Sequence, residues 1–276
     1  GKEWFSAGGD RVVLHWTSPS EVKAIAQTTA TVYSLCYDQK HQSLWVGQAD
    51  GSLLWLDLAH GRINKRIEAG NDPIFHLSLA PDQKHLAVLG HSGRLDYYEL
   101  QTGILSKSWP LPANKCRQMC WDSTSKRWNI CADEGTLWIF DPENPNHEIQ
   151  KLTLAEWPLF SCLSLENGQR IFGGKDARLY FLNAKNRLIF PGLEAHNYAI
   201  YQIKLSPNGT CFATASRDKT AKWWQADSGK LLGRLGRPMH KHGHTHSVND
   251  LCWLNNQTLL TAGDDQSLRI WELPII

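Results

Sequence analysis

Four histidines stand at every second position of residues 240–246: His240, His242, His244 and His246. In an extended chain alternate side chains lie on one side, so these imidazoles could share one ion. Imidazole suits zinc, nickel or copper. No cysteine pair or carboxylate cluster close by completes a ligand set. We therefore predict neither metal nor cofactor, and keep a metal-binding or enzymatic site at His240, His242 and His246 as an alternative.

Other sequence patterns that signal catalysis are missing. The chain has no Walker loop, HExxH, GxSxG elbow or CxxC pair, so we predict that it is not an enzyme. The seven cysteines are scattered through apolar runs, which favours reduced, buried thiols over a disulfide framework. Cys116 and Cys120 share one expected strand and its edge, where packing is the simpler role. Reduced thiols are typical of the cell interior, so we expect a cytoplasmic protein.

Composition excludes several partners. The 276 residues are 42% hydrophobic and 20% charged, which is enough apolar material for a core. Lysine and arginine number 29 against 27 aspartate and glutamate, so the net charge is only +2. We expect no nucleic-acid partner, because that usually needs a strongly basic surface. No run of 18 apolar residues is present, so we expect no membrane span.

A repeat runs through the whole chain. Short turns between strand-like runs align at anchor positions 10, 50, 92, 134, 176, 218 and 265, which lie 40 to 47 residues apart. Six residues after each anchor stands a large apolar residue: Trp16, Leu56, Tyr98, Phe140, Leu182, Trp224 and Trp271. Seven such matches in one register indicate seven copies of one structural unit.

Each full unit reads as four short strands. In the sixth, strand-like runs cover 198–205, 211–216, 220–225 and 230–235, and turn signals separate them at 206–209 and 227–229. A unit of this length with four strands is typical of a propeller blade, which must stack on its neighbours to bury its faces. We therefore predict an all-β fold: one seven-bladed β-propeller over residues 1–276, with four-stranded antiparallel blades.

The sequence resembles the WD40-repeat family. The sixth unit carries Ala195-His196, Thr214-Ala-Ser-Arg-Asp218 and Trp223-Trp224, and the seventh carries Gly243-His244, Thr261-Ala-Gly-Asp-Asp265 and Trp271-Glu272. In that family a histidine, a serine or threonine, an aspartate and a tryptophan form a hydrogen-bonded tetrad within a blade. The resemblance assigns these tetrads to His196, Thr214, Asp218 and Trp224, to His244, Thr261, Asp265 and Trp271, and in part to Ser6, Asp10 and Trp16.

The second to fifth units depart from the tetrad pattern together. Their serine or threonine position holds Val46, Val88, Ile130 and Phe172. A half-satisfied buried polar network costs more than an apolar core. We therefore expect these four blades to be held by apolar packing.

The first and last blades are expected to be incomplete. By alignment the first lacks its inner strand and the last its outer strand. About 21 residues upstream of Gly1 would supply both strands, since strands run 3–10 residues. Whether those residues are truncated, disordered or donated by another chain stays open.

The resemblance implies a binding role for the loop face, the face that bears the loops into each inner strand and the anchor turns. We expect a protein or peptide partner there, since aromatic and arginine side chains resemble interaction hot spots. Alternatives are aromatic residues that plug the channel, a cage of Tyr33, Phe75 and Tyr201 for methylated lysine, or a structural module of a larger protein. The candidate residues are Tyr33, Phe75, His91, Lys115, Arg117, Asp133, Lys175, Tyr201, Arg217, Asn249 and Asp264.

Overall fold

The structure is a computed structural model that describes residues 3–189 and 191–274. These residues form strands, turns and loops, and none of them lies in a helix. The chain divides into two compact units, Gly1–Gln118 and Met119–Ile276, which are described separately.

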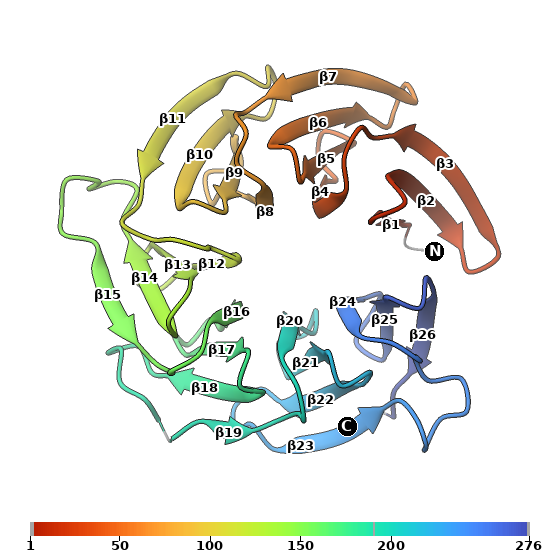
Figure 1. Ribbon diagram of the computed structural model, residues 1–276, viewed down its shortest axis with the longest axis vertical. Coiled ribbons are helices and arrows are strands. Elements are labelled where there is room, and N and C mark those ends of the chain that lie inside the picture. The colour runs from red at the N-terminus through yellow and green to blue at the C-terminus, as the bar shows by residue number, and fades with distance from the viewer. Residues whose placement is uncertain (1–2, 190, 275–276) are drawn as a thin grey trace. The chain divides into compact units, whose positions relative to one another are not determined.

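The first unit holds three antiparallel sheets (Figure 1). Within each sheet the strands pair in chain order, so every sheet is a meander. The sheets consist of β1 (Trp4–Ser6), β2 (Val12–Ser18) and β3 (Glu21–Gln27); of β4 (Val32–Asp38), β5 (Ser43–Gln48), β6 (Ser52–Asp57) and β7 (Arg62–Glu68); and of β8 (Ile74–Leu79), β9 (His85–Gly90), β10 (Arg94–Glu99) and β11 (Leu105–Pro110).

The second unit holds four sheets of the same design, and its first strand, β12, begins at the unit boundary. The sheets consist of β12 (Gln118–Asp122), β13 (Arg127–Cys131), β14 (Thr136–Phe140) and β15 (Gln150–Thr153); of β16 (Leu159–Ser164), β17 (Arg170–Gly174), β18 (Arg178–Leu182) and β19 (Leu193–Glu194); of β20 (Ile200–Leu205), β21 (Cys211–Ser216), β22 (Ala221–Gln225) and β23 (Leu231–Leu235); and of β24 (Val248–Trp253), β25 (Thr258–Gly263) and β26 (Leu268–Glu272).

The anchor turns share one backbone feature. The residue after each anchor has a positive φ, with values from 58° to 94°. This left-handed conformation reverses the chain tightly between the second and third strands of a sheet. It recurs at Arg11, Gly51, Gly93, Gly135, Ala177, Lys219 and Gln266.

The core of each unit lies between neighbouring sheets. In the first unit Trp45 and Trp55 stack at 4.9 Å and pack against Ile74 and Leu86 of the next sheet. In the second unit Leu182 joins a cluster with Ile139 and Leu159, and Trp224 joins one with Phe181. A single sheet cannot bury both of its faces, so stacking sheets supplies the apolar burial that stabilises each unit.

The first and last sheets have three strands each among the described residues. By register, β1 to β3 are the second to fourth strands of a blade, and β24 to β26 are the first to third. This is the arrangement that the repeat predicted. Completion of both sheets by about 21 further residues stays a prediction.

Candidate functional site

A β-bulge near the start of the inner strand recurs in five sheets. In each, one residue of the inner strand has no partner on the second strand, and the register shifts across it. Bulges re-aim side chains and are common beside binding sites. The bulge lies next to the anchor turn, so it belongs to the loop face. The bulged residues are Tyr33, Phe75, Phe160, Tyr201 and Asn249.

Four predicted loop-face residues of the first unit form one cluster. Phe75 stacks on Tyr33 with ring centroids 4.9 Å apart, and the Arg117 guanidinium lies 4.4 Å from the Phe75 ring centroid. The His91 ring also lies 4.9 Å from Phe75. Tyr33 stays 47% exposed, so the stack ends at a side chain that a partner can reach. Lys115, the fifth candidate in this unit, is exposed close by in sequence.

In the second unit the structure pairs the candidates differently. Lys175 holds its ammonium 4.5 Å from the ring centroid of Trp157, which is 50% exposed. Tyr201 lies 6.0 Å from Phe160. The Asn249 amide donates to the Asp264 carboxylate.

The remaining candidates of the second unit differ in burial. Arg217 is exposed and Asp133 is half-buried. Sequence reasoning missed Phe160 and Trp157. Phe160 follows Leu159, the first apolar residue of its inner strand, and that position could have identified it.

Two residues of the methyl-lysine cage alternative, Phe75 and Tyr201, contact other side chains within their own units. Arg117 already lies over the Phe75 ring, and Tyr201 packs beside Phe160. An aromatic face that carries one cation has little attraction left for a second.

The tetrad of the sixth blade forms a continuous hydrogen-bond chain. His196 donates from Nδ1 to the Asp218 carboxylate at 2.9 Å, so its Nε2 accepts from Thr214 Oγ1 at 2.7 Å. Thr214 Oγ1 in turn accepts from Trp224 Nε1 at 3.0 Å. The hydrogen bonds join the loop before β20 to β21, to β22 and to the anchor turn between these two strands, so the tetrad has a structural role.

The same chain recurs in the seventh blade and in part in the first. His244 lies 2.9 Å from Asp265 and 2.8 Å from Thr261, whose hydroxyl accepts from Trp271 at 2.9 Å. In the first blade Trp16 Nε1 donates to Ser6 Oγ at 2.9 Å, and Asp10 accepts from the Val12 backbone N–H.

Burial sets the protonation state of the tetrads. Burial lowers the pKa of His196 and of His244, although the neighbouring carboxylates favour the charged form. Burial alone would raise the pKa of Asp218. Hydrogen bonds from His196, Thr220 and the Asn197 N–H outweigh it and hold that pKa well below its usual range. Each tetrad therefore combines a neutral imidazole with a carboxylate.

The expectation of purely apolar second to fifth blades needs correction. Val46, Val88, Ile130 and Phe172 are buried as expected. Other polar contacts nevertheless hold the anchor turns, because a turn leaves backbone and side-chain groups to satisfy.

Each of these contacts uses residues close to its own anchor. Asp50 accepts from Ser52 Oγ at 2.6 Å, and Ser52 Oγ accepts from the fully buried Gln48 at 2.6 Å. Tyr180 donates to Asp176 at 2.6 Å.

The histidine segment, residues 240–246, is not extended. The His240 N–H donates to the Gly236 carbonyl and the Gly243 N–H to the His240 carbonyl, so the segment turns on itself. His240 packs edge-on against Trp271, His244 belongs to a tetrad, and His242 and His246 are exposed. Within the described residues, no three histidine, cysteine, aspartate or glutamate side chains gather as ligands for a metal ion.

Two cysteine thiols are strongly disfavoured as thiolates. None of the seven cysteines forms a disulfide, and burial raises the pKa of Cys116 and Cys252 to about 12. A thiol with so high a pKa stays protonated and is a poor nucleophile or ligand.

The geometry and the comparison with solved structures define the fold class. A chain in a crystal structure of the mitotic checkpoint complex matches 99% of this chain, and 84% of its own length, with a TM-score of 0.83 and 17% identity. The fold is that of a seven-bladed β-propeller, as the repeat predicted.

The family follows from the sequence comparisons. Residues 188–225 and 236–272 match the family model described as WD domain, G-beta repeat. These residues span the two blades with complete tetrads, and this part of the chain consists of WD40 repeats.

Two curated relatives match over a shorter stretch. A bromodomain and WD repeat-containing protein of Dictyostelium discoideum is 33% identical over 95 residues, which are 34% of this chain and 4% of the relative. The ribosome biogenesis protein WDR12 homolog of Drosophila mojavensis is 30% identical over 90 residues, which are 29% of this chain and 22% of the relative. The chain therefore matches less than a quarter of the length of either relative.

The structure also bears on membranes. In the part of the chain that it describes, no helix combines the length and apolar character that a membrane crossing requires.

Proposed function

We propose that this protein is a non-catalytic scaffold that binds a protein or peptide partner through the loop face. One observation carries the proposal: five inner strands bulge at the same position and present an aromatic or amide side chain there. A bulge disrupts local pairing. Its recurrence at the loop face indicates a use for the side chains that it presents.

The composition of this surface supports a protein partner. Tyrosine, tryptophan and arginine are the residues most enriched in interaction hot spots. In the first unit Tyr33, Phe75 and Arg117 are held rigidly by mutual stacking, so binding loses little side-chain entropy. The chain of similar fold belongs to a crystal structure of the mitotic checkpoint complex, and a place in a complex is consistent with protein binding.

Affinity capture with matched variants tests the proposal. The loop-face variant combines Tyr33→Ala, Phe75→Ala and Arg117→Ala. The control variant combines Val22→Ala, Ile63→Ala and Ile104→Ala, which remove exposed apolar side chains elsewhere in the same unit. We expect a protein that wild type and control retain and the loop-face variant loses, with at least about a tenfold weaker affinity when the purified pair is titrated. Identical sets of captured proteins for both variants would refute the proposal.

A further inference from the structure

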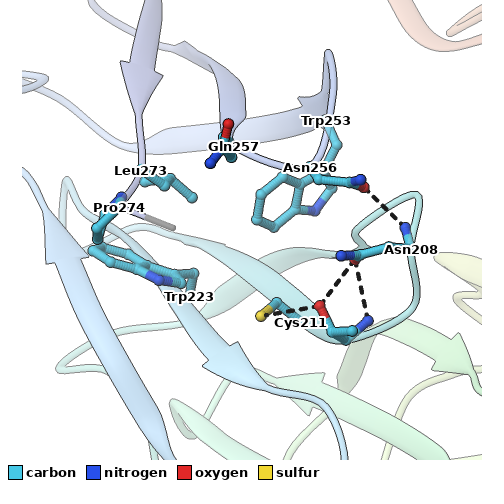
Figure 2. Close-up of a pocket in the computed structure, with 9 residues that line it drawn as sticks. Asn208, Cys211, Trp223, Trp253, Asn256, Gln257, Leu273 and Pro274 are labelled. Atoms are coloured by element: carbon cyan, nitrogen blue, oxygen red, sulfur yellow. Dashed lines mark hydrogen bonds between the residues drawn. The ribbon is translucent and has the colours of Figure 1, made fainter. Parts of the chain in front are cut away.

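A pocket of about 250 Å³ opens at the end of two neighbouring sheets that lies away from the loop face (Figure 2). Both sheets belong to the second unit. The turns after β20 and β24 form two of its walls, because each joins a first strand to a second. Its lining consists of Asn208, Thr210, Cys211, Trp223, Trp253, Asn256, Gln257, Leu273 and Pro274.

Two tryptophans give the pocket rigid aromatic walls. Trp223 is 8% exposed and lies so close to Gly233 that a Cβ there would meet its ring at 2.0 Å. Trp253 is fixed by donation from Nε1 to the Lys204 carbonyl at 3.0 Å. Figure 2 shows Pro274 beside Trp223, so a proline ring of the chain itself already lies at one indole.

The side-chain amides leave mainly donors for a ligand. Asn208 Oδ1 accepts from the Thr210 hydroxyl at 2.9 Å and its N–H at 3.3 Å, and Asn256 Oδ1 accepts from the Asn208 N–H at 3.0 Å. Because a backbone N–H can only donate, these bonds fix which amide atom is oxygen. Among the described residues, the side-chain amide nitrogens of Asn208, Asn256 and Gln257 form no hydrogen bond, so they remain available as donors.

The uncharged, donor-rich lining of the pocket disfavours charged ligands and ligands rich in N–H groups. None of the lining side chains is charged, so ionic groups gain no partner on entering the pocket. The oxygens of Asn208 and Asn256 are already used, so a ligand rich in N–H groups would lose its hydrogen bonds to water. The volume lies below the range usual for drug-sized ligands, which suits a short stretch of peptide.

Polyproline has the complementary properties. Proline has an apolar ring and no backbone N–H, and the polyproline II helix leaves its carbonyls without internal hydrogen bonds. Aromatic grooves recognise such segments because the helix is preformed and loses little entropy on binding. We propose that this pocket binds a proline-rich segment of a partner protein, with a prolyl ring on the half-buried Trp253 and peptide carbonyls at the amide donors.

This second site is independent of the loop face. The anchor turns lie between the second and third strands, and the pocket lies at the turns between the first and second. We therefore expect a variant that loses binding at the pocket to keep its binding at the loop face.

Fluorescence anisotropy with labelled decaproline tests the proposal on the full chain. We expect saturable binding of decaproline, and at least tenfold weaker binding of a ten-residue glycine–serine peptide of equal length. Absence of saturable binding up to millimolar peptide, or equal affinity for both peptides, would overturn the assignment.

Two variants place the binding in the pocket. Gln257→Glu replaces an amide donor with a charged acceptor, and we expect at least tenfold weaker decaproline binding. Gln266→Glu makes the same chemical change in the exposed anchor turn of the same sheet, and we expect unchanged affinity. Trp253→Leu removes an aromatic wall and should abolish binding.

Unfolding curves of the variants separate loss of the site from loss of the fold. Because the Gln257 side chain forms no hydrogen bond with any residue that the structure describes, Gln257→Glu is expected to keep the wild-type unfolding midpoint and so to report on the site alone. Unchanged affinity in both Gln257→Glu and a folded Trp253→Leu would overturn the proposal. Self-association that Gln257→Glu abolishes, without peptide binding, would assign the pocket to a second copy of the chain instead.

Discussion

At the scale of single residues, the hydrogen-bond direction within each tetrad depends on a neutral histidine. His196 donates to Asp218 and accepts from Thr214, and this frees the threonine oxygen to accept from Trp224. A protonated imidazole would donate from both nitrogens, so it could no longer accept a hydrogen bond from the Thr214 hydroxyl. The tetrad is therefore both a packing unit and a titratable one.

Removing tetrad members should cost a large share of the protein's stability. We expect Trp224→Ala and Asp218→Ala each to lower the free energy of unfolding by about 2–5 kcal/mol, through lost packing or an unsatisfied buried group. Trp224→Phe keeps most of the ring and loses one hydrogen bond, so it should cost less than Trp224→Ala. Urea unfolding measures all three, and an unchanged midpoint for Asp218→Ala would contradict the role assigned to the tetrad.

Stability should also fall in mild acid. The folded-state pKa of His196 lies below its ordinary value of 6.5 because the ring is buried. Below pH 6.5 the unfolded chain binds a proton that the folded chain does not, so stability is fully present above 6.5 and declines as the pH falls. The slope for His196 reaches at most about 1.4 kcal/mol per pH unit, and His244 acts in the same direction.

Unfolding curves at several pH values measure this slope. In His196→Asn we expect lower stability at pH 7.5 and a flatter decline toward pH 5.5. An equal slope in wild type and variant would contradict a neutral, buried His196. The aspartates contribute only at lower pH. The depressed folded pKa of Asp218 gives stability that is present above its ordinary pKa of 3.8 and is lost as the pH falls toward the folded value.

At the scale of elements, blades with and without a tetrad use the same position for core packing. Leu182 in β18 stands six residues after its anchor, as Trp224 does in β22. Both are buried between neighbouring sheets. The repeat therefore keeps a large apolar side chain at this position, whereas the hydrogen bonds around it differ between blades.

Leu182→Ala tests that equivalence. We expect a loss of about 2–5 kcal/mol, because the leucine is fully buried and its removal leaves a cavity. Leu188, which is 45% exposed, supplies the control, and Leu188→Ala should change stability by less than about 0.5 kcal/mol. A neutral Leu182→Ala would show that the register assigned to the fifth blade is wrong.

At the scale of the whole molecule, the two ends of the sheets have different chemistry. The loop face carries aromatic side chains with arginine and lysine beside them, whereas the pocket is uncharged and lined by indoles and amides. A fold of repeated sheets allows this, because turns at either end vary without altering the packed strands.

The histidine segment should contribute no metal-dependent stability. The structure turns residues 240–246, packs His240 against Trp271 and bonds His244 to Thr261, so these two imidazoles already have partners within the protein. We expect EDTA to leave the melting temperature of untagged protein unchanged, and His242→Ala and His246→Ala to stay within about 0.5 kcal/mol of wild type. Stoichiometric metal in the purified protein, with a lower melting temperature after chelation, would contradict this.

The amino-acid sequence by itself determined the number of blades and the register of the anchors, and its resemblance to the WD40-repeat family implied the members of the tetrads. The number and the register follow from a local rule, because strand and turn signals recur at a fixed spacing. It also indicated that Tyr33, Phe75 and Tyr201 belong to the loop face, since each follows the first apolar residue of an inner strand.

Only the tertiary structure decided which of these residues meet. Spacing along the chain does not show that Arg117 covers Phe75, that Tyr201 packs beside Phe160, or that the histidine segment turns. The pocket joins Asn208, Trp223 and Gln257 from different strands and turns of two sheets. Such contacts depend on how neighbouring sheets stack, and stacking is set by side-chain volumes across the whole interface rather than by any local pattern.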